Sequence, residues 1–221
     1  MTADSQVRVD TRDMHSVHHS IKRGLNDAPG QVASVADGDR ERAQRLADYL
    51  ADLLWLLHAH HASEDALLYP LLIERLPEHR ELFLRMDAQH AAVTAGTEEA
   101  QRDVARFRAS ATEADGRALA RSCTSLLEVL AEHLGQEEEQ VLPLVPGVIS
   151  VPEWAALPGH ALSQYRGARM WLPLGLVIEA MPEEMSAALG KQLPPPVANM
   201  WFGGGADAFT AEMAAVRGGT A

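Results

Sequence analysis

Two short segments of the chain share one order of residues, a histidine, then a glutamate four positions on, then a proline six positions after the glutamate. They are His60-His-Ala-Ser-Glu64 with Pro70, and His133-Leu-Gly-Gln-Glu137 with Pro143. On a helix, residues four apart lie on one face, so each segment presents an imidazole and a carboxylate side by side. Two such pairs facing each other across a helical bundle, with histidines from the other helices, predict a dinuclear iron or manganese site.

The spacing of apolar residues predicts the helices that would position these groups. Inward positions three or four residues apart run through four candidate helices, as in amphipathic helices around one core. They are Met14, His18, Ile21 and Leu25; Leu46, Leu50, Leu53, Leu57, His60, Glu64, Leu67 and Leu71; Phe83, Met86, His90, Val93 and Thr97; and Leu119, Cys123, Leu126, Leu130, His133, Glu137, Val141 and Leu144. Each stripe contains a histidine. Ionisable groups in a core are costly unless they are paired or coordinated, which favours metal binding.

Turn signals separate the four predicted helices at Asn26 to Asp39, at Leu76-Pro77 and at Ser110 to Gly116. In antiparallel helices, two residues equidistant from the connecting turn lie at one height, because the rise per residue is constant at about 1.5 Å. The midpoints between the stripe histidines of successive helices fall in or beside these turns. We therefore expect an all-α, up-down-up-down four-helix bundle with its histidines in one layer.

Composition narrows the function further. The chain has 221 residues and a formal net charge of −12, which argues against nucleic acid or an anionic membrane as the main partner. We find neither a transmembrane-length apolar stretch nor a signal-peptide pattern, and so expect a cytoplasmic protein. The single cysteine, Cys123, excludes an internal disulfide and a cysteine-based metal site, and we interpret it as a small core residue.

The segments HHASEDALLYPLL and HLGQEEEQVLPLV resemble the two signature segments of hemerythrin-like proteins, the HHE cation-binding domains. VHHSIKRGL and MDAQHAAV resemble the first and third helices of that family, and the resemblance covers about residues 10–148. It implies a non-haem centre of two iron ions, with manganese as an alternative, that handles dioxygen, peroxide or nitric oxide. Carried over by position, the terminal ligands are His18, His60, His90 and His133, and the bridging ligands are Glu64 and Glu137.

One departure from the family concerns the third helix. Oxygen-carrying members have a second histidine there, where this chain has Thr94. Two metals have roughly twelve coordination positions, and four histidines, two bridging glutamates and a bridging oxo or hydroxo group leave about two open. Water or one nearby side chain would fill one; the candidates are His15, His19, His61 and Asp87. Reversible oxygen carriage is therefore disfavoured against reactive or sensory chemistry.

Other polar residues near these segments have simpler interpretations. The side chains of His15, His19, His58 and His61 lie one or two positions off the stripes, so we place them at the surface or around the ligands. Glu138 and Glu139 are interpreted as a solvated face.

After Ser150, proline or glycine interrupts the chain every ten to fifteen residues, which predicts short helices with irregular joints. We assign residues 10–148 to the bundle and residues 149–221 to a C-terminal helical extension that packs on it. A plain covering role is favoured over substrate gating. The sequence leaves monomer and homodimer open.

Two functional classes remain for this site. The first is a binding module that scavenges, senses or stores dioxygen, peroxide or nitric oxide. The second is a diiron oxidase or oxygenase with a small organic substrate under the extension. An apolar pocket reaching the metals would favour the enzyme, and a narrow channel the binding module. A metal-free structural bundle is disfavoured, because its level core histidines would be unpaired.

Overall fold

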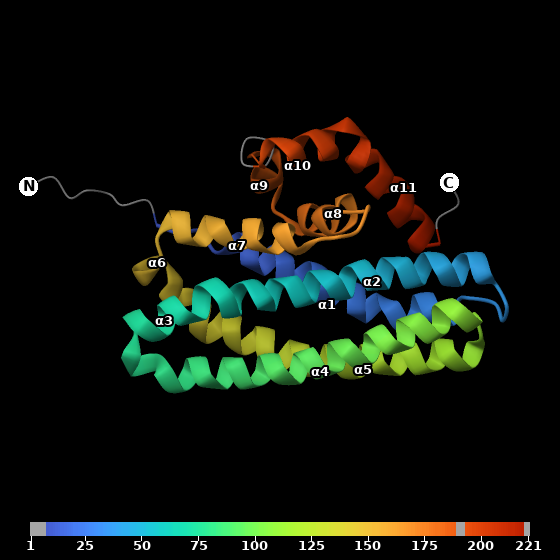
Figure 1. The fold of residues 1–221 in the computed structure, drawn as a ribbon, viewed down its shortest axis with the longest axis horizontal. Coiled ribbons are helices and arrows are strands. Elements are labelled where there is room, and N and C mark those ends of the chain that lie inside the picture. The colour runs from blue at the N-terminus through green and yellow to red at the C-terminus, as the bar shows by residue number, and fades with distance from the viewer. Residues whose placement is uncertain (1–7, 189–192, 219–221) are drawn as a thin grey trace, which may run out of the picture.

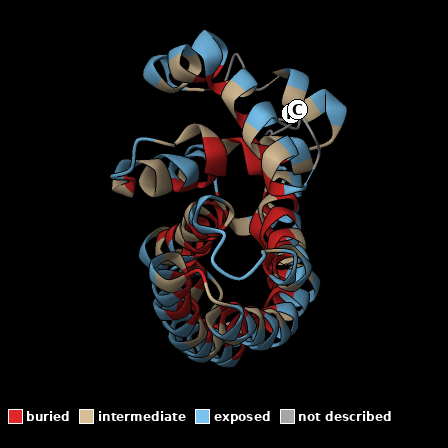
Figure 2. Ribbon diagram, turned by 90° about the vertical axis from the view of Figure 1, so that its right-hand side faces the viewer, coloured by how far each residue is buried: buried red, intermediate tan, exposed pale blue. Residues whose placement is uncertain are grey.

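Four long helices form an up-down-up-down bundle (Figure 1). The computed structural model describes residues 8–188 and 193–218, and this part of the chain contains helices and no β-strand. The bundle helices are α1 (Arg12–Ala33), α2 (Arg40–Ser63), α4 (Arg80–Ser110) and α5 (Glu113–Gln136). Their buried residues face the inside of the bundle (Figure 2). The predicted fold class is confirmed.

The first and third turns between these helices are shorter than predicted. Helix α1 continues through Pro29 to Ala33, because Leu25, Ala28 and Val32 extend its buried stripe. The third predicted turn shrinks to Ala111 and Thr112. Ala111 adopts the left-handed conformation with φ 52°, and the Thr112 side chain accepts a hydrogen bond from the Asp115 N–H as the cap of α5.

Helices α2 and α5 each run into one wide π-helical turn, η1 (Glu64–Leu68) and η3 (Glu137–Val141). In both, the residue before the proline donates its N–H to the carbonyl of the glutamate five positions earlier. A proline in an α-helix lacks an N–H, and its ring collides with the carbonyl four residues earlier. The wider turn before Pro70 and Pro143 relieves that conflict, and each of these two π-turns begins at a predicted ligand.

Each π-turn adds one residue and thereby shifts the inward face of the chain that follows. The expected inward positions Leu67, Leu71 and Leu144 are wrong, since these side chains are only half-buried. Their C-terminal neighbours take the inward positions instead; these are Leu68, Leu72 and Val145. The shifted segments are α3 (Tyr69–Arg75), η4 (Leu142–Leu144) and α6 (Val145–Val148), and η2 (Pro77–His79) connects α3 to α4.

The C-terminal extension consists of short helices that lie over α1 and α2 (Figures 1 and 2). They are α7 (Val151–Gln164), α8 (Trp171–Ala180), α9 (Glu183–Ala188), α10 (Pro195–Met200), η6 (Trp201–Gly205) and α11 (Ala206–Val216). Leu172, Leu176 and Val216 are almost completely buried and belong to the same apolar cluster as the bundle side chains. Residues 189–192 and 219–221 of the predicted extension lie outside the described residues.

Polar contacts also attach the extension. Glu179 of α8 forms ion pairs with Arg23 of α1 and with Arg217, which follows α11; the Arg217 pair measures 2.6 Å. The Trp154 indole N–H donates to the carboxylate of Asp13 at 3.1 Å, which ties α7 to α1.

The core has two apolar clusters with a polar layer between them. The larger cluster includes Leu50 and Phe107 and extends toward the α1–α2 connection. The smaller one includes Phe83 and Met86 and fills the opposite end. Among the described residues, no helix is both long and apolar enough to cross a membrane.

Candidate metal centre

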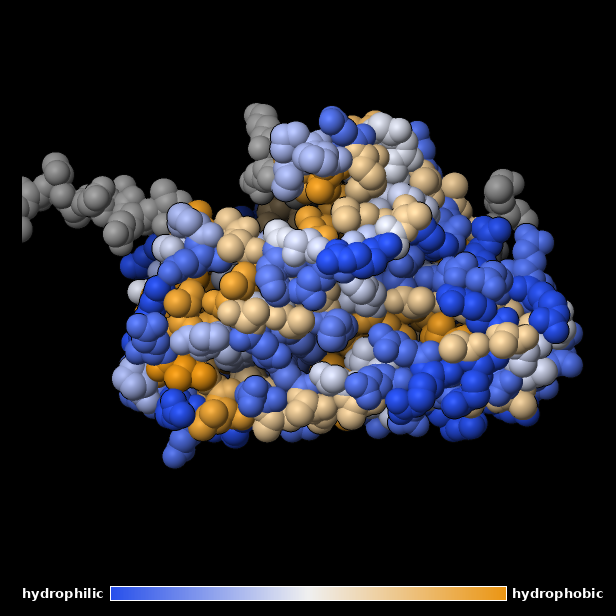
Figure 3. All heavy atoms as spheres, in the orientation of Figure 1, coloured by the Kyte–Doolittle hydropathy of each residue, from blue (hydrophilic) through white to orange (hydrophobic). Residues whose placement is uncertain are grey.

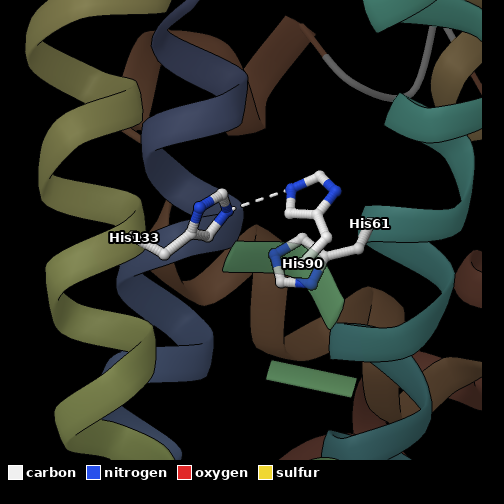
Figure 4. A group of neighbouring side chains, drawn as sticks. All are labelled: His61, His90 and His133. Carbon is white, nitrogen blue, oxygen red and sulfur yellow. Dashed lines mark hydrogen bonds between the residues drawn. The ribbon is translucent and has the colours of Figure 1, made fainter. Parts of the chain in front are cut away.

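Seven ionisable side chains meet in the polar layer, and none of them is more than 7% exposed. Six are the ligands proposed from the sequence, and the seventh is His61. They come from all four bundle helices and both π-turns: His18, His60, His61, Glu64, His90, His133 and Glu137. Potential ligand atoms form two groups, each within 4.8 Å: His61, His90 and His133, and His18, His60, Glu64 and Glu137. Figure 4 shows the first group, with imidazoles from three helices facing one another.

The two carboxylates of the second group also lie close to histidines of the first group. Glu64 places Oε1 3.5 Å from Nε2 of His60 and Oε2 3.8 Å from Nε2 of His90. Oε2 of Glu137 lies 3.5 Å from Nε2 of His18 and 3.8 Å from Nε2 of His133. Each carboxylate therefore lies within 4 Å of an imidazole nitrogen of both groups.

The sequence placed His61 at the surface or around the ligands and kept it as one candidate for a further ligand; the structure places it inside the cluster. It is 4% exposed because the inward face of α2 is two residues wide at this height, so that successive histidines reach different groups. In the second segment the position that corresponds to His61 is Leu134, which is fully buried. An apolar residue at that position was the sequence signal that the inward face is two residues wide.

The remaining candidates point away from the cluster. Exposed side chains include His15, His19, His58, Asp87 and Thr94. The surface interpretation of the three histidines is confirmed. Thr94 does not reach the site, so its identity says little about the number of histidines there. Cys123 is a buried core residue as predicted, and burial raises the pKa of its thiol to about 12.

Two outer carboxylates fix the orientation of the histidines. His90 Nδ1–H donates to Asp65 at 2.6 Å, and His18 Nδ1–H donates to Glu138 at 2.9 Å. A carboxylate only accepts, so each imidazole carries its proton on Nδ1 and turns the Nε2 lone pair to the centre. The interpretation of Glu138 as part of a solvated face is wrong, because its carboxylate reaches across to α1, where Lys22 also bonds it at 3.1 Å.

A chain of side-chain amides fixes His133 in the same way. The Glu132 carboxylate accepts from Gln136 at 3.3 Å, and the Gln136 carbonyl accepts from Gln89 at 3.1 Å. Because the Gln89 amide nitrogen donates to Gln136, its carbonyl oxygen faces His133. This oxygen accepts from His133 Nδ1–H at 3.2 Å.

His90 and His133 consequently face each other with two lone pairs. Their Nε2 atoms are 3.1 Å apart, the contact drawn as a dashed line in Figure 4. With both protons held on Nδ1, neither Nε2 can donate to the other. A cation bound by both nitrogens would remove this repulsion.

Burial sets the charge state of the cluster. It lowers the pKa of His60 and His61 well below the usual value and, with the nearby His90, lowers that of His133 to about 3. Burial and the charge of Glu137 raise the pKa of Glu64 well above its usual value. At neutral pH these three imidazoles therefore offer lone pairs, while the Glu64 carboxylate lacks a positive charge to stabilise it.

Within the described residues, buried polar atoms without a hydrogen-bond partner concentrate in this layer. They are Nε2 of His18, His60 and His61, both carboxylate oxygens of Glu64, and Oε2 of Glu137. Leaving such a group unpaired costs about 1–3 kcal/mol. All six atoms are lone-pair donors that a divalent cation would bind, so the residues fit a metal centre.

Comparison with known families decides the class of protein. The model described as hemerythrin HHE cation binding domain matches residues 9–145. The chain belongs to this family. The match covers all seven clustered side chains and ends before α7, and a hemerythrin domain binds metal cations. Searches among curated proteins and among solved structures gave no significant match.

Proposed function

We propose that this hemerythrin domain binds two iron ions and uses them to take up dioxygen, peroxide or nitric oxide for scavenging, sensing or storage. The observation that carries the proposal is the set of unpartnered, buried lone-pair atoms arranged in two adjoining groups. Manganese would suit the same donors. When bound, the metal pair supplies the capacity to bind and reduce these small oxidants.

Different sets of the clustered side chains would hold the two ions. We assign one ion to His61, His90 and His133 and the other to His18 and His60, with Glu64 and Glu137 shared. Five histidines, two bridging carboxylates and a bridging oxo or hydroxo group would fill about eleven of roughly twelve coordination positions. The two-histidine side would be the less saturated one, so an external ligand would bind there. Asp65, Glu138 and Gln89 keep the lone pairs aimed inward before a metal arrives.

His61 changes the expectation about oxygen chemistry. The case against reversible carriage rested on a fifth histidine missing at Thr94, and His61 brings the number of histidines in the cluster to five. We therefore include reversible dioxygen binding among the outcomes to be tested, beside irreversible scavenging.

The enzyme alternative has less support. A surface pocket of about 310 Å³ between η1, α3 and α4 is lined by Asp65 and Tyr69 but by no residue of the extension. Tyr69 is 5% exposed and stands between this pocket and the buried histidines. A second pocket, of about 270 Å³, lies between α2 and the extension, where Arg169 and Glu212 line it, but none of its lining residues belongs to the histidine cluster. A diatomic ligand needs only a narrow path.

Metal analysis of protein expressed with iron tests the site. We expect roughly two irons per chain, and His61→Ala should reduce this number. His58→Ala is the matched control, because its imidazole is exposed on the same helix. An iron content near zero in the native protein, or one unchanged in a His60→Ala, His133→Ala double variant, would overturn the assignment.

Spectra of the reduced, iron-loaded protein through a cycle of oxygenation and degassing test the chemistry. A visible band that disappears on degassing shows reversible binding, and lasting oxidation shows scavenging. Oxygen consumption that continues only when an organic reductant is turned over would instead favour the oxidase.

A further inference from the structure

The two His-x3-Glu segments differ at a buried position beside the cluster. Tyr69 comes five residues after Glu64, and Leu142 comes five residues after Glu137. Each donates the backbone N–H that closes its π-turn, and they are 5% and 2% exposed. The repeat therefore has a phenol in one copy and an apolar side chain in the other.

The phenol makes the two carboxylates unequal. The Tyr69 hydroxyl donates to Oε1 of Glu137 at 2.9 Å, across the bundle from one segment to the other. Leu142 cannot make the corresponding bond to Glu64, and both oxygens of Glu64 lack a partner. Glu64 consequently turns one oxygen to each histidine group, whereas Glu137 turns only Oε2 to them.

The bond is strong enough to matter. A hydroxyl donating to a carboxylate forms a charge-assisted hydrogen bond, roughly twice as strong as a neutral one. Both partners are buried, and the low local dielectric strengthens the bond further. Without this hydrogen bond, Oε1 of Glu137 would be free to bind a cation held by the neighbouring imidazoles and carboxylates.

We propose that Tyr69 is a positioning residue that holds Oε1 of Glu137 out of coordination and thereby keeps one position open for an external ligand. This rests on the proposed dinuclear site. The apolar part of Tyr69 has a separate role: its ring packs edge-on against Phe83 and His90, at centroid distances of 6.3 and 5.3 Å. Phenylalanine would keep that packing and the wall of the adjoining pocket, so Tyr69→Phe removes only the hydroxyl.

Azide titration of the oxidised, iron-loaded protein tests the proposal, with visible absorption as the readout. We expect Tyr69→Phe to bind the same amount of iron. Without metal it should melt several degrees below the native chain, because it leaves the buried Oε1 of Glu137 unpaired, and a loss of that size lowers the melting temperature measurably in a chain of this size. Its azide dissociation constant should rise about tenfold, because the released oxygen competes for the open position. Tyr49→Phe is the control, since Tyr49 is a buried phenol in the other apolar cluster.

The outcomes separate the two proposals. If native protein and Tyr69→Phe take up two irons and bind azide equally, the positioning role is overturned and the metal centre stands. If the native chain takes up no iron, both proposals fall. A tenfold loss of azide affinity in Tyr69→Phe but not in Tyr49→Phe supports the positioning role.

Discussion

An imidazole binds a metal only through the nitrogen that carries no proton, and in this protein residues outside the ligand set decide which nitrogen that is. Asp65 and Glu138 each follow a shared glutamate directly, and each accepts the Nδ1 proton of a histidine on a different helix. The same short segment thus provides a ligand for one position and an orienting partner for another.

The sequence indicated the candidate ligands more readily than the residues that orient them. Six of the seven clustered side chains were predicted because polar residues on an apolar stripe are visible in one helix alone. His61 was only one of four candidates for a further ligand, because the inward stripe was taken to be one residue wide. Glu138 and Tyr69 were missed because their contacts join residues 120 and 68 positions apart, which no local pattern reports.

Glu138 and Glu139 offer a matched pair for testing this orienting role. Glu138→Ala should weaken metal binding about 10- to 100-fold, the usual cost of losing an orienting partner of a metal-bound histidine. Glu139→Ala removes the same charge from an exposed neighbour and should have little effect. Competition with a chelator measures both, and equal losses would show that charge, not orientation, matters.

At the scale of the helices, the four long elements could be predicted because each carries a stripe of period 3.6 over many residues. Two features escaped that reasoning. The buried residues Leu25, Ala28 and Val32 continued α1 through a proline that was taken for a turn. The π-turns shifted the stripe after Glu64 and Glu137 by one residue, and a regular period cannot indicate such an insertion.

Pro70 and Pro143 should be needed for metal binding more than for folding. Alanine at both positions supplies the missing N–H groups and removes the ring clash, so the wide turns can close to α-helix. The glutamates and the residues after them would then change their relative orientation. We expect metal affinity to fall at least tenfold with helix content unchanged, as measured by chelator competition and circular dichroism.

Pro29→Ala is the control for this pair, because Pro29 lies inside α1 and no π-turn accompanies it. Comparable loss of metal affinity in Pro29→Ala would mean that general helix changes, not the π-turns, disturb the centre.

On the scale of the whole molecule, the layer of buried histidines and glutamates separates two apolar clusters and is the costly part of the core. Cations that bind only the folded state stabilise it by mass action, and their removal leaves buried groups uncompensated. We therefore expect chelation to lower the melting temperature substantially in calorimetry. Equal melting temperatures with and without metal would contradict this.

Leucine at positions 60, 64, 133 and 137 provides the converse test. Well-packed apolar replacements avoid the cost of buried charge, so the fourfold variant should regain stability relative to the metal-free native protein. It should also bind no metal. A variant that melts below the metal-free native chain would show that the cluster's groups are not a burden on the fold.

The attachment of the extension should weaken in acid. Arg217, and then the adjacent Arg23, hold the pKa of Glu179 below its usual value. A carboxylate with a lowered folded pKa contributes stability that is present above its unfolded pKa, near 4.3, and is lost as pH falls through the folded pKa. Three of the four tryptophans lie in the extension, so their fluorescence should change below about pH 4.

Glu179→Gln identifies the source of that change. The variant cannot gain a charge-neutralising proton at this position, so the part of the acid transition due to Glu179 should disappear. Identical acid titrations of native and variant protein would exclude Glu179 as the sensitive contact.

The hydrogen bonds that orient His90 and His18 connect the two helical hairpins in opposite directions. This affects how two chains could assemble. Asp65 of the α1–α2 hairpin serves His90 of the α4–α5 hairpin, and Glu138 of the second serves His18 of the first. Each hairpin is thus half of a complementary pair. Two chains exchanging hairpins would preserve all of these contacts, so the contacts alone do not distinguish a monomer from an exchanged dimer. The covalent connection through Leu76 and η2 favours pairing within one chain, because it holds the two hairpins at a high effective concentration.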